Sequence, residues 1–207
     1  IGTVNSFFVG TISTLIATAL GTLAALGLSR PHMPYKGLIM SILISPMIVP
    51  LIITAAGMFF FYAKINLVYT FTGIILAHVA LSTPFVVITV TATLVGFDTN
   101  MTKASQSLGA RPIRTFFKVI MPLILPGVIS GALFAFITSF DEVVIVMFMA
   151  SLDQLTIPKQ MWAGIRQEIS PVILCMATCL VALSIFLLTT VELLRRRSEK
   201  MRGITAR

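Results

Sequence analysis

The sequence predicts an all-α, polytopic bundle of transmembrane helices, on the grounds of composition, apolar run length and charge placement. Of the 207 residues, 57% are hydrophobic and 11% are charged, against about 25% charged in soluble domains. The mean hydropathy is +1.01. A soluble domain of this size needs more polar surface to cover its core. The composition therefore excludes soluble enzymes, disordered chains and secreted disulfide scaffolds.

Five apolar runs are long enough to cross a bilayer, because a transmembrane helix needs about 20 largely apolar residues. None of them shows the period-two alternation of a half-buried strand. The predicted spans are Val4–Leu28, Leu38–Tyr62, Tyr69–Val95, Met121–Ala150 and Pro171–Leu194.

Basic residues in alternate linkers predict the orientation. Linkers 29–37 and 96–120 and the tail after residue 194 together carry twelve Lys and Arg residues, whereas the other side carries three. Cytoplasmic loops are enriched in Lys and Arg, so we place the twelve, with the C-terminus, in the cytoplasm. The net charge of +8 is assigned to this asymmetry and not to nucleic-acid binding.

The chain 1–207 is predicted to form one transmembrane domain with its N-terminus outside. It begins with Ile1, and no charged leader precedes the first apolar run. An outside N-terminus and five spans predict a sixth, N-terminal span in the full gene product.

Small residues and prolines mark places of close approach and helix breakage. Ala17, Gly21 and Ala25 lie four residues apart in the first span, a spacing that lets another helix approach closely. Broken spans are frequent where substrates pass, although a structural kink is the alternative for any single proline. The prolines in question are Pro46, Pro50, Pro84, Pro122 and Pro126.

Linker 96–120 predicts two helices joined at a glycine. Asp98 or Thr99 suits a helix N-cap, Gly109 suits the left-handed residue that follows a helix, and Pro112 suits a first turn. We interpret the segment as an elbow at the cytoplasmic membrane face, with an interfacial amphipathic linker as the alternative. The predicted apolar faces contain Met101, Ala104 and Leu108, then Ile113, Phe116, Phe117 and Ile120.

The elbow resembles the cytoplasmic loop motif of ABC importer permeases. In that family the motif reads Glu-Ala-Ala, three residues, Gly, about nine residues, Ile, one residue, Leu-Pro. The spacing of Gly109, Ile120 and Pro122 matches it, but the triplet is Lys103-Ala104-Ser105, so a basic residue replaces the acidic one. Four further stretches resemble the spermidine/putrescine permease subfamily: Ser82–Val87, Asp141–Val144, Thr156–Pro158 and Gly164–Pro171.

The resemblance implies a six-span permease with the type I ABC importer fold. It implies that the elbow docks in a cleft of a cytoplasmic ATPase, which binds ATP and Mg²⁺ and drives alternating access. The implied partners are a second permease, two ATPases and a periplasmic solute-binding protein. The chain has no G-x-x-x-x-G-K-[ST] phosphate loop, so no cofactor is expected in it. The expected coupling residues are Lys103, Ala104, Ser105, Leu108, Gly109, Ala110 and Arg111.

Asp141 and Glu142 are predicted to line the substrate path. If the fourth span proper begins at Gly127, Asp141 lies about 21 Å along it, in the outer half. Carboxylates inside a span usually face a water-filled path or a partner, and a cationic amine suits them as a ligand. The alternatives are an ion pair with Lys159 or Arg166, a role in the outer gate, and simple solvation.

Three other features receive structural interpretations. His78 has no acidic neighbour in its own span, which favours a hydrogen bond to a neighbouring helix over a proton relay. The outer loop 151–170 is predicted to form an amphipathic interfacial helix anchored by Trp162. The resemblance makes this loop an outer gate and adds Trp162 to the substrate path; a plain interfacial loop is the alternative. Cys175 and Cys179 have no further zinc ligands nearby, so they are interpreted as small apolar residues of a helix.

The predicted function is that of a permease subunit of a bacterial ABC importer for a polyamine or a related small cation. A self-sufficient channel or secondary transporter is the alternative class, because broken spans and buried carboxylates suit it too. Opines, other amines and anions are the alternative substrates. An intramembrane enzyme is disfavoured, because the sequence has no H-E-x-x-H or G-x-S-x-G motif.

Overall fold

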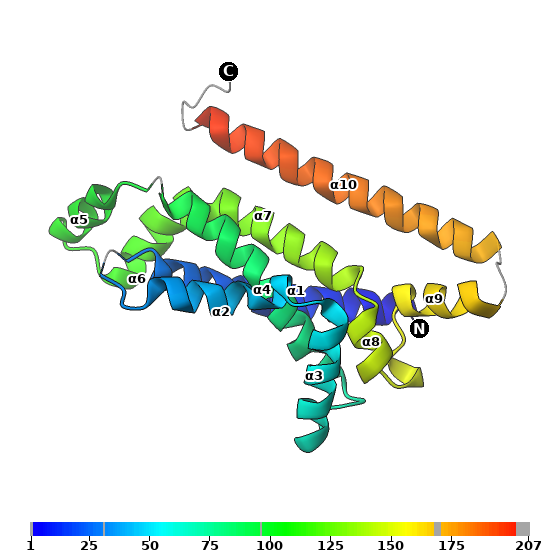
Figure 1. Ribbon diagram of the computed structural model, residues 1–207. Coiled ribbons are helices and arrows are strands. Elements are labelled where there is room, and N and C mark those ends of the chain that lie inside the picture. The colour runs from blue at the N-terminus through cyan, green and yellow to red at the C-terminus, as the bar shows by residue number, and fades with distance from the viewer. Residues whose placement is uncertain (1, 31, 96, 168–170, 202–207) are drawn as a thin grey trace.

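The computed structural model describes residues 2–30, 32–95, 97–167 and 171–201, and within them the chain is helical and contains no strand (Figure 1). The elements are α1 (Gly2–Leu28), α2 (Lys36–Ile48), α3 (Leu51–Lys64), α4 (Phe71–Val95), α5 (Thr99–Ser107), α6 (Pro112–Thr115), the π-helical turn η1 (Phe116–Ile120), α7 (Met121–Phe140), α8 (Val144–Met149), the 3₁₀ turn η2 (Leu152–Gln154), α9 (Ile157–Gln167) and α10 (Pro171–Met201).

Four helical stretches in the described residues are long and apolar enough to cross a membrane. They are α1, α4, the stretch Pro112–Phe140, and Ile173–Thr190 within α10. These correspond to the first, third, fourth and fifth predicted spans. The all-α, multi-span fold class is thereby confirmed.

The second predicted span, Leu38–Tyr62, is a broken helix in the structure, as its prolines predict. It is divided into α2 and α3, whose axes differ by 104°. The break falls at Val49, which is extended (φ −71°, ψ 134°), and at Pro50, which precedes α3. A residue before proline is pushed out of the helical region, and proline offers no N–H to the preceding turn. The chain therefore turns sharply instead of crossing straight.

The fourth predicted span, Met121–Ala150, has different boundaries in the structure. Helix continues through α6, η1 and α7, so the assumption used in placing Asp141, that the fourth span begins anew at Gly127, is wrong. The π-helical turn η1 directly precedes α7, whose second residue is Pro122, and such turns occur as local irregularities inside α-helices. At the other end α7 stops at Phe140, so the expected position of Asp141 inside a continuous span is also wrong.

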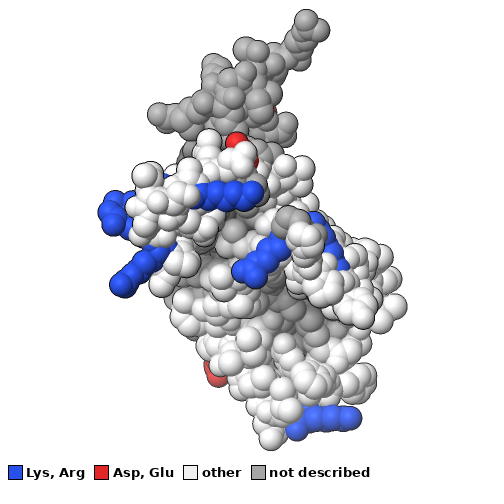
Figure 2. All heavy atoms as spheres, turned by 90° about the vertical axis from the view of Figure 1, so that its left-hand side faces the viewer, with Lys and Arg blue, Asp and Glu red and all other residues white. Residues whose placement is uncertain are grey.

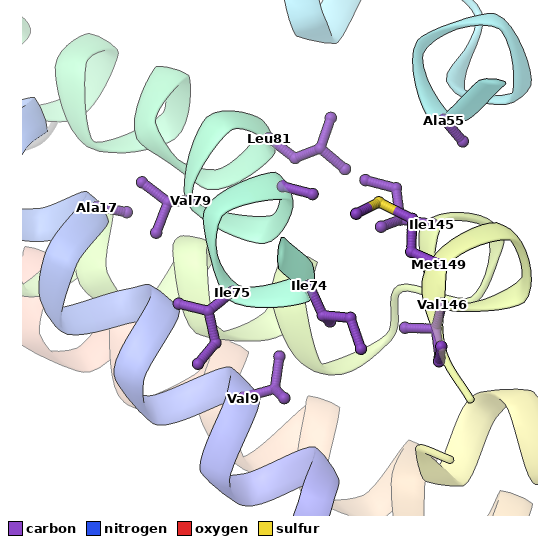
Figure 3. Packing of buried hydrophobic residues seen from close by; sticks show 12 residues of the cluster. Val9, Ala17, Ala55, Ile74, Ile75, Val79, Leu81, Ile145, Val146 and Met149 are labelled. Atoms are coloured by element: carbon purple, nitrogen blue, oxygen red, sulfur yellow. The ribbon is translucent and has the colours of Figure 1, made fainter. Parts of the chain in front are cut away.

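The core lies where α1, α4 and α7 pack together. Ala17 and Ala25 are fully buried, and a Cβ on Gly21 would lie 2.6 Å from the Cβ of Val86 in α4. The small-residue face predicted in the first span is therefore the contact with α4. Figure 3 shows the cluster that joins α1 and α4 to α3 and α8, with Val9, Ala17, Ala55, Ile74, Ile75, Val79, Leu81, Ile145, Val146 and Met149 labelled.

The two ends of the molecule differ in charge. The α1–α2 linker, α5, α6 and the C-terminal end of α10 lie at one end, and α8, α9 and the N-terminal end of α1 lie toward the other (Figure 1). Lys and Arg side chains gather over the first end (Figure 2). The segments predicted to share one side of the membrane therefore lie together; which side they face stays a prediction. The exposed cations of the α1–α2 linker, the start of α2 and the elbow are Arg30, Lys36, Lys103, Arg111, Arg114 and Lys118.

Candidate functional site

A cavity of about 630 Å³ lies where the α2–α3 bend meets α4 and the end of α7. Most of its lining is apolar, and its ionisable lining residues are Asp141 and Glu142. The break between α2 and α3 and the break between α7 and α8 thus meet at one cavity, as broken spans do in many transport proteins. The lining residues are Pro46, Met47, Ile48, Val49, Pro50, Leu51, Leu81, Phe85, Ile137, Thr138, Asp141, Glu142 and Val143.

The two neighbouring carboxylates have different surroundings. Asp141 is the C-cap of α7, where its backbone N–H donates to the carbonyl of Ile137, and its side chain is exposed at the cavity. Glu142 is only 6% exposed. Its Oε1 and Oε2 lie 2.9 and 3.0 Å from the backbone nitrogen of Ile145, and Oε2 lies 3.3 Å from that of Val146. The structure brings both residues to the cavity, but it exposes one of them.

His78 connects this region to α4. Its Nδ1 lies 2.8 Å from Oγ of Ser139 in α7, which confirms the predicted hydrogen bond to a neighbouring helix. Its Nε2 lies 3.6 Å from Oε2 of Glu142 and has no hydrogen-bond partner. This acidic neighbour could not be predicted from the sequence, because it follows a different helix and no local spacing signals it.

Lys159 does not pair with the carboxylates, so the alternative of an ion pair with Lys159 is wrong. Its Nζ donates instead to the backbone carbonyls of Val146 and Ala150, both at 3.1 Å. Partial burial lowers the pKa of this ammonium. The side chain of Arg166, the other predicted partner, lies outside the described residues.

Trp162 lies apart from the cavity. It belongs to α9, which is amphipathic as predicted, and its side chain is 47% exposed. It is not among the residues that line the cavity. Its place in the substrate path stays a prediction.

The elbow forms with the local structure that its sequence predicts. The Asp98 side chain caps α5 by accepting from the backbone N–H of Asn100 at 2.9 Å. Gly109 has φ +80°; its N–H donates to the carbonyl of Gln106, and the next N–H, of Ala110, donates to that of Ser105. This pair of bonds ends α5 as a glycine C-cap.

Most of the predicted coupling residues are exposed on the elbow: Lys103, Ala104, Leu108, Gly109 and Arg111. Leu108 is 88% exposed, although it is apolar. Ser105 is half-buried and lies 3.1 Å from Oγ1 of Thr115, which joins α5 to α6. The elbow thus presents a preformed surface that the described residues leave exposed.

The described residues contain no group of three or more His, Cys, Asp or Glu side chains that could hold a metal ion. Cys175 and Cys179 are exposed, unpaired thiols on α10.

Comparison with known proteins identifies the family. Residues 17–200 match the family model described as "Binding-protein-dependent transport system inner membrane component". The chain belongs to this family. Membership confirms the resemblance to ABC importer permeases and makes the chain a multi-pass transport subunit instead of an enzyme. It also decides against the self-sufficient channel or secondary transporter.

Named relatives belong to polyamine systems. The spermidine/putrescine transport system permease protein PotC of Haemophilus influenzae is 29% identical over 196 residues, which cover 95% of this chain and 76% of that protein. The putrescine transport system permease protein PotI of Escherichia coli K12 is 30% identical over 179 residues, which cover 81% and 63%.

Solved structures share the fold. A chain of the inward-facing MetNI methionine ABC transporter has a TM-score of 0.65 at 19% identity, covering 99% of this chain and 95% of that one. A chain of a bacterial ABC transporter involved in the import of alginate also has a TM-score of 0.65, at 15% identity, covering 99% and 74%. The fold is therefore that of a type I ABC importer permease, as predicted.

Proposed function

We propose that this chain is the permease subunit of a bacterial ABC importer that passes a polyamine such as spermidine or putrescine. Two independent facts support this substrate class: the names of its relatives, and a cavity whose exposed ionisable side chain is a carboxylate. The second observation carries the proposal, because it concerns this chain's own residues.

The cavity chemistry suits a linear amine. Asp141 would form a charge-assisted hydrogen bond with one ammonium group. Apolar walls that include Met47, Leu81 and Phe85 would contact the methylene chain, as apolar surfaces do with the stems of Lys and Arg side chains. An anion would face a carboxylate, which disfavours anionic substrates.

The elbow is the proposed docking site for the ATPase. Its exposed residues around Gly109 would seat in a cleft of that subunit, which binds ATP and Mg²⁺, and this chain would contribute no cofactor of its own. A second permease, two ATPases and a solute-binding protein complete the assembly. The docking residues are Lys103, Ala104, Ser105, Leu108, Gly109, Ala110 and Arg111.

The proposed orientation follows the basic end. The elbow and the C-terminus would lie in the cytoplasm, and the outer loop 151–170, with Trp162, would form an outer gate near the binding protein. The membrane is the bacterial inner membrane.

The test is ATP hydrolysis by the complex co-expressed with its ATPases and reconstituted in nanodiscs. Binding protein is added with spermidine, with putrescine or without ligand. We expect stimulation of hydrolysis only by loaded binding protein, because transport energy comes from the partner chains.

If the ATPases copurify but no polyamine stimulates ATP hydrolysis, the chain is still an importer permease and the proposed substrate class is wrong. Failure of any ATPase to copurify would refute the proposed assembly.

A further inference from the structure

Helix α8 has a charged side chain bonded to its backbone at each end. At its N-terminal end the Glu142 carboxylate accepts from the backbone N–H groups of Ile145 and Val146. At its C-terminal end the Lys159 ammonium donates to the carbonyls of Val146 and Ala150. The two N–H groups lie in the first turn of α8, where a helix offers no internal partner. At the other end the Val146 carbonyl also accepts from the backbone N–H of Ala150, so Lys159 adds a second bond there. The signs of both charges complement the helix dipole.

Glu142 is already fully engaged by the protein. Although it borders the cavity, both carboxylate oxygens accept backbone N–H groups, and Oε2 also lies 3.6 Å from Nε2 of His78. The residue is 6% exposed. A substrate ammonium could reach this carboxylate only by breaking the N-terminal end of α8. Asp141, one residue earlier, is exposed and carries no such bonds to α8.

Helix α8 is also fixed to the bundle. Ile145, Val146 and Met149 are fully buried and pack in the cluster that joins α1 and α4 (Figure 3). The carbonyl of Met149 accepts from the backbone N–H of Tyr69, just before α4. Since the chain passes from α7 to α8 through residues 141–143, the position of α8 fixes where Asp141 leaves α7.

We propose that Glu142 and Lys159 are positioning residues for transport. They hold α8 from its two ends, and α8 in turn holds the Asp141 carboxylate at the cavity. The substrate is bound by Asp141, and Glu142 does not touch it. This inference rests on the proposed role of Asp141 in the substrate path.

The main experiment is a double-mutant cycle on the number of polyamine molecules imported per ATP hydrolysed, in proteoliposomes with saturating loaded binding protein. We expect Glu142→Gln to lower this ratio about three- to tenfold, because it removes the charge and one of two acceptor oxygens. In an Asp141→Asn background the same substitution should lower it no further, since residues that act through one another are not additive.

Substitutions of Lys159 test the C-terminal end of α8 by the same ratio of import to ATP hydrolysis. Lys159→Met removes both bonds to α8 and should lower the ratio, whereas Lys159→Arg keeps cationic donors and should restore most of it. Lys64→Met is the matched control, because Lys64 is an exposed lysine at the end of α3 and should leave the ratio unchanged.

Amide hydrogen exchange of the assembled complex measures how firmly Glu142 holds the N-terminal end of α8, independently of transport. Glu142→Gln should speed amide exchange at Ile145 and Val146, while Asp141→Asn should not. Unchanged exchange in Glu142→Gln would overturn the inference, as would parallel losses of ATPase and uptake at a constant ratio. If Asp141→Asn itself leaves the ratio unchanged, the proposed substrate path is wrong. Faster exchange in Glu142→Gln would then show only that Glu142 holds the N-terminal end of α8.

Discussion

Two adjacent carboxylates acquire different environments from one helix end. Asp141 caps α7 and faces the cavity, whereas Glu142 turns into the bundle and bonds to α8. From the sequence both residues are predicted to line the substrate path, because both are acidic residues within one apolar run. The position at which α7 ends decides which of the two is exposed at the cavity. No local pattern marks that end, because no glycine or proline lies between Phe140 and Val144.

Asp141→Asn should reduce polyamine import per ATP by about tenfold or more, because the ammonium loses a charge-assisted hydrogen bond. Uptake and ATP hydrolysis are measured together in proteoliposomes. Asp153→Asn is the control, because Asp153 is exposed on η2 and does not line the cavity. Equal ratios in the two variants would remove Asp141 from the substrate path.

Among the helices, a proline has different effects at different positions: it can begin a helix, break it or leave it intact. Pro112 begins α6 as predicted, because a first-turn proline has no hydrogen bond to lose. Pro50 breaks the second span at 104°. Pro84 lies inside α4 without ending it. Sequence reveals all three prolines, but packing around each decides whether the helix continues.

The elbow turn depends on backbone conformation and not on space. Gly109 has φ +80° and nothing lies within 4 Å of a Cβ placed there. A β-branched residue is disfavoured in this left-handed region by about 1–2 kcal/mol. Gly109→Val should therefore distort the turn and uncouple ATP hydrolysis from import.

Gly109→Asn is the matched control, since Asn tolerates the left-handed conformation. Import per ATP is measured for both variants at equal insertion. Normal coupling in the Val variant would exclude the elbow turn from ATPase docking.

At the scale of the whole molecule, the bundle depends on small residues between α1, α4 and α7. Gly21 of α1 packs on Val86, and Gly127 and Gly131 of α7 pack on α4 at Thr93 and Thr89. Small side chains let helix backbones approach closely in a bilayer, where dispersion contacts replace the hydrophobic effect as the driving force.

Two glycines of α1 test this packing. Gly21→Ala places a Cβ 2.6 Å from that of Val86 and should destabilise the complex by about 1–3 kcal/mol through overpacking. Gly27→Ala meets nothing within 4 Å and should be neutral, or stabilising by up to about 1 kcal/mol through helix propensity. Thermal unfolding of the purified complex compares them; equal midpoints would contradict the packing argument.

The membrane class, the five apolar runs and the elbow could be predicted from the sequence, as could a proline break in the second run. These follow from composition, run length and capping chemistry, which act over a few residues. The end of α7 at Phe140, the pairing of His78 with Ser139 and Glu142, and the bonds from Lys159 to α8 could not be read from the sequence and arise from the tertiary packing. These side-chain contacts join residues up to 64 positions apart in the chain. A buried polar group bonds to whichever partner the packed helices bring to it.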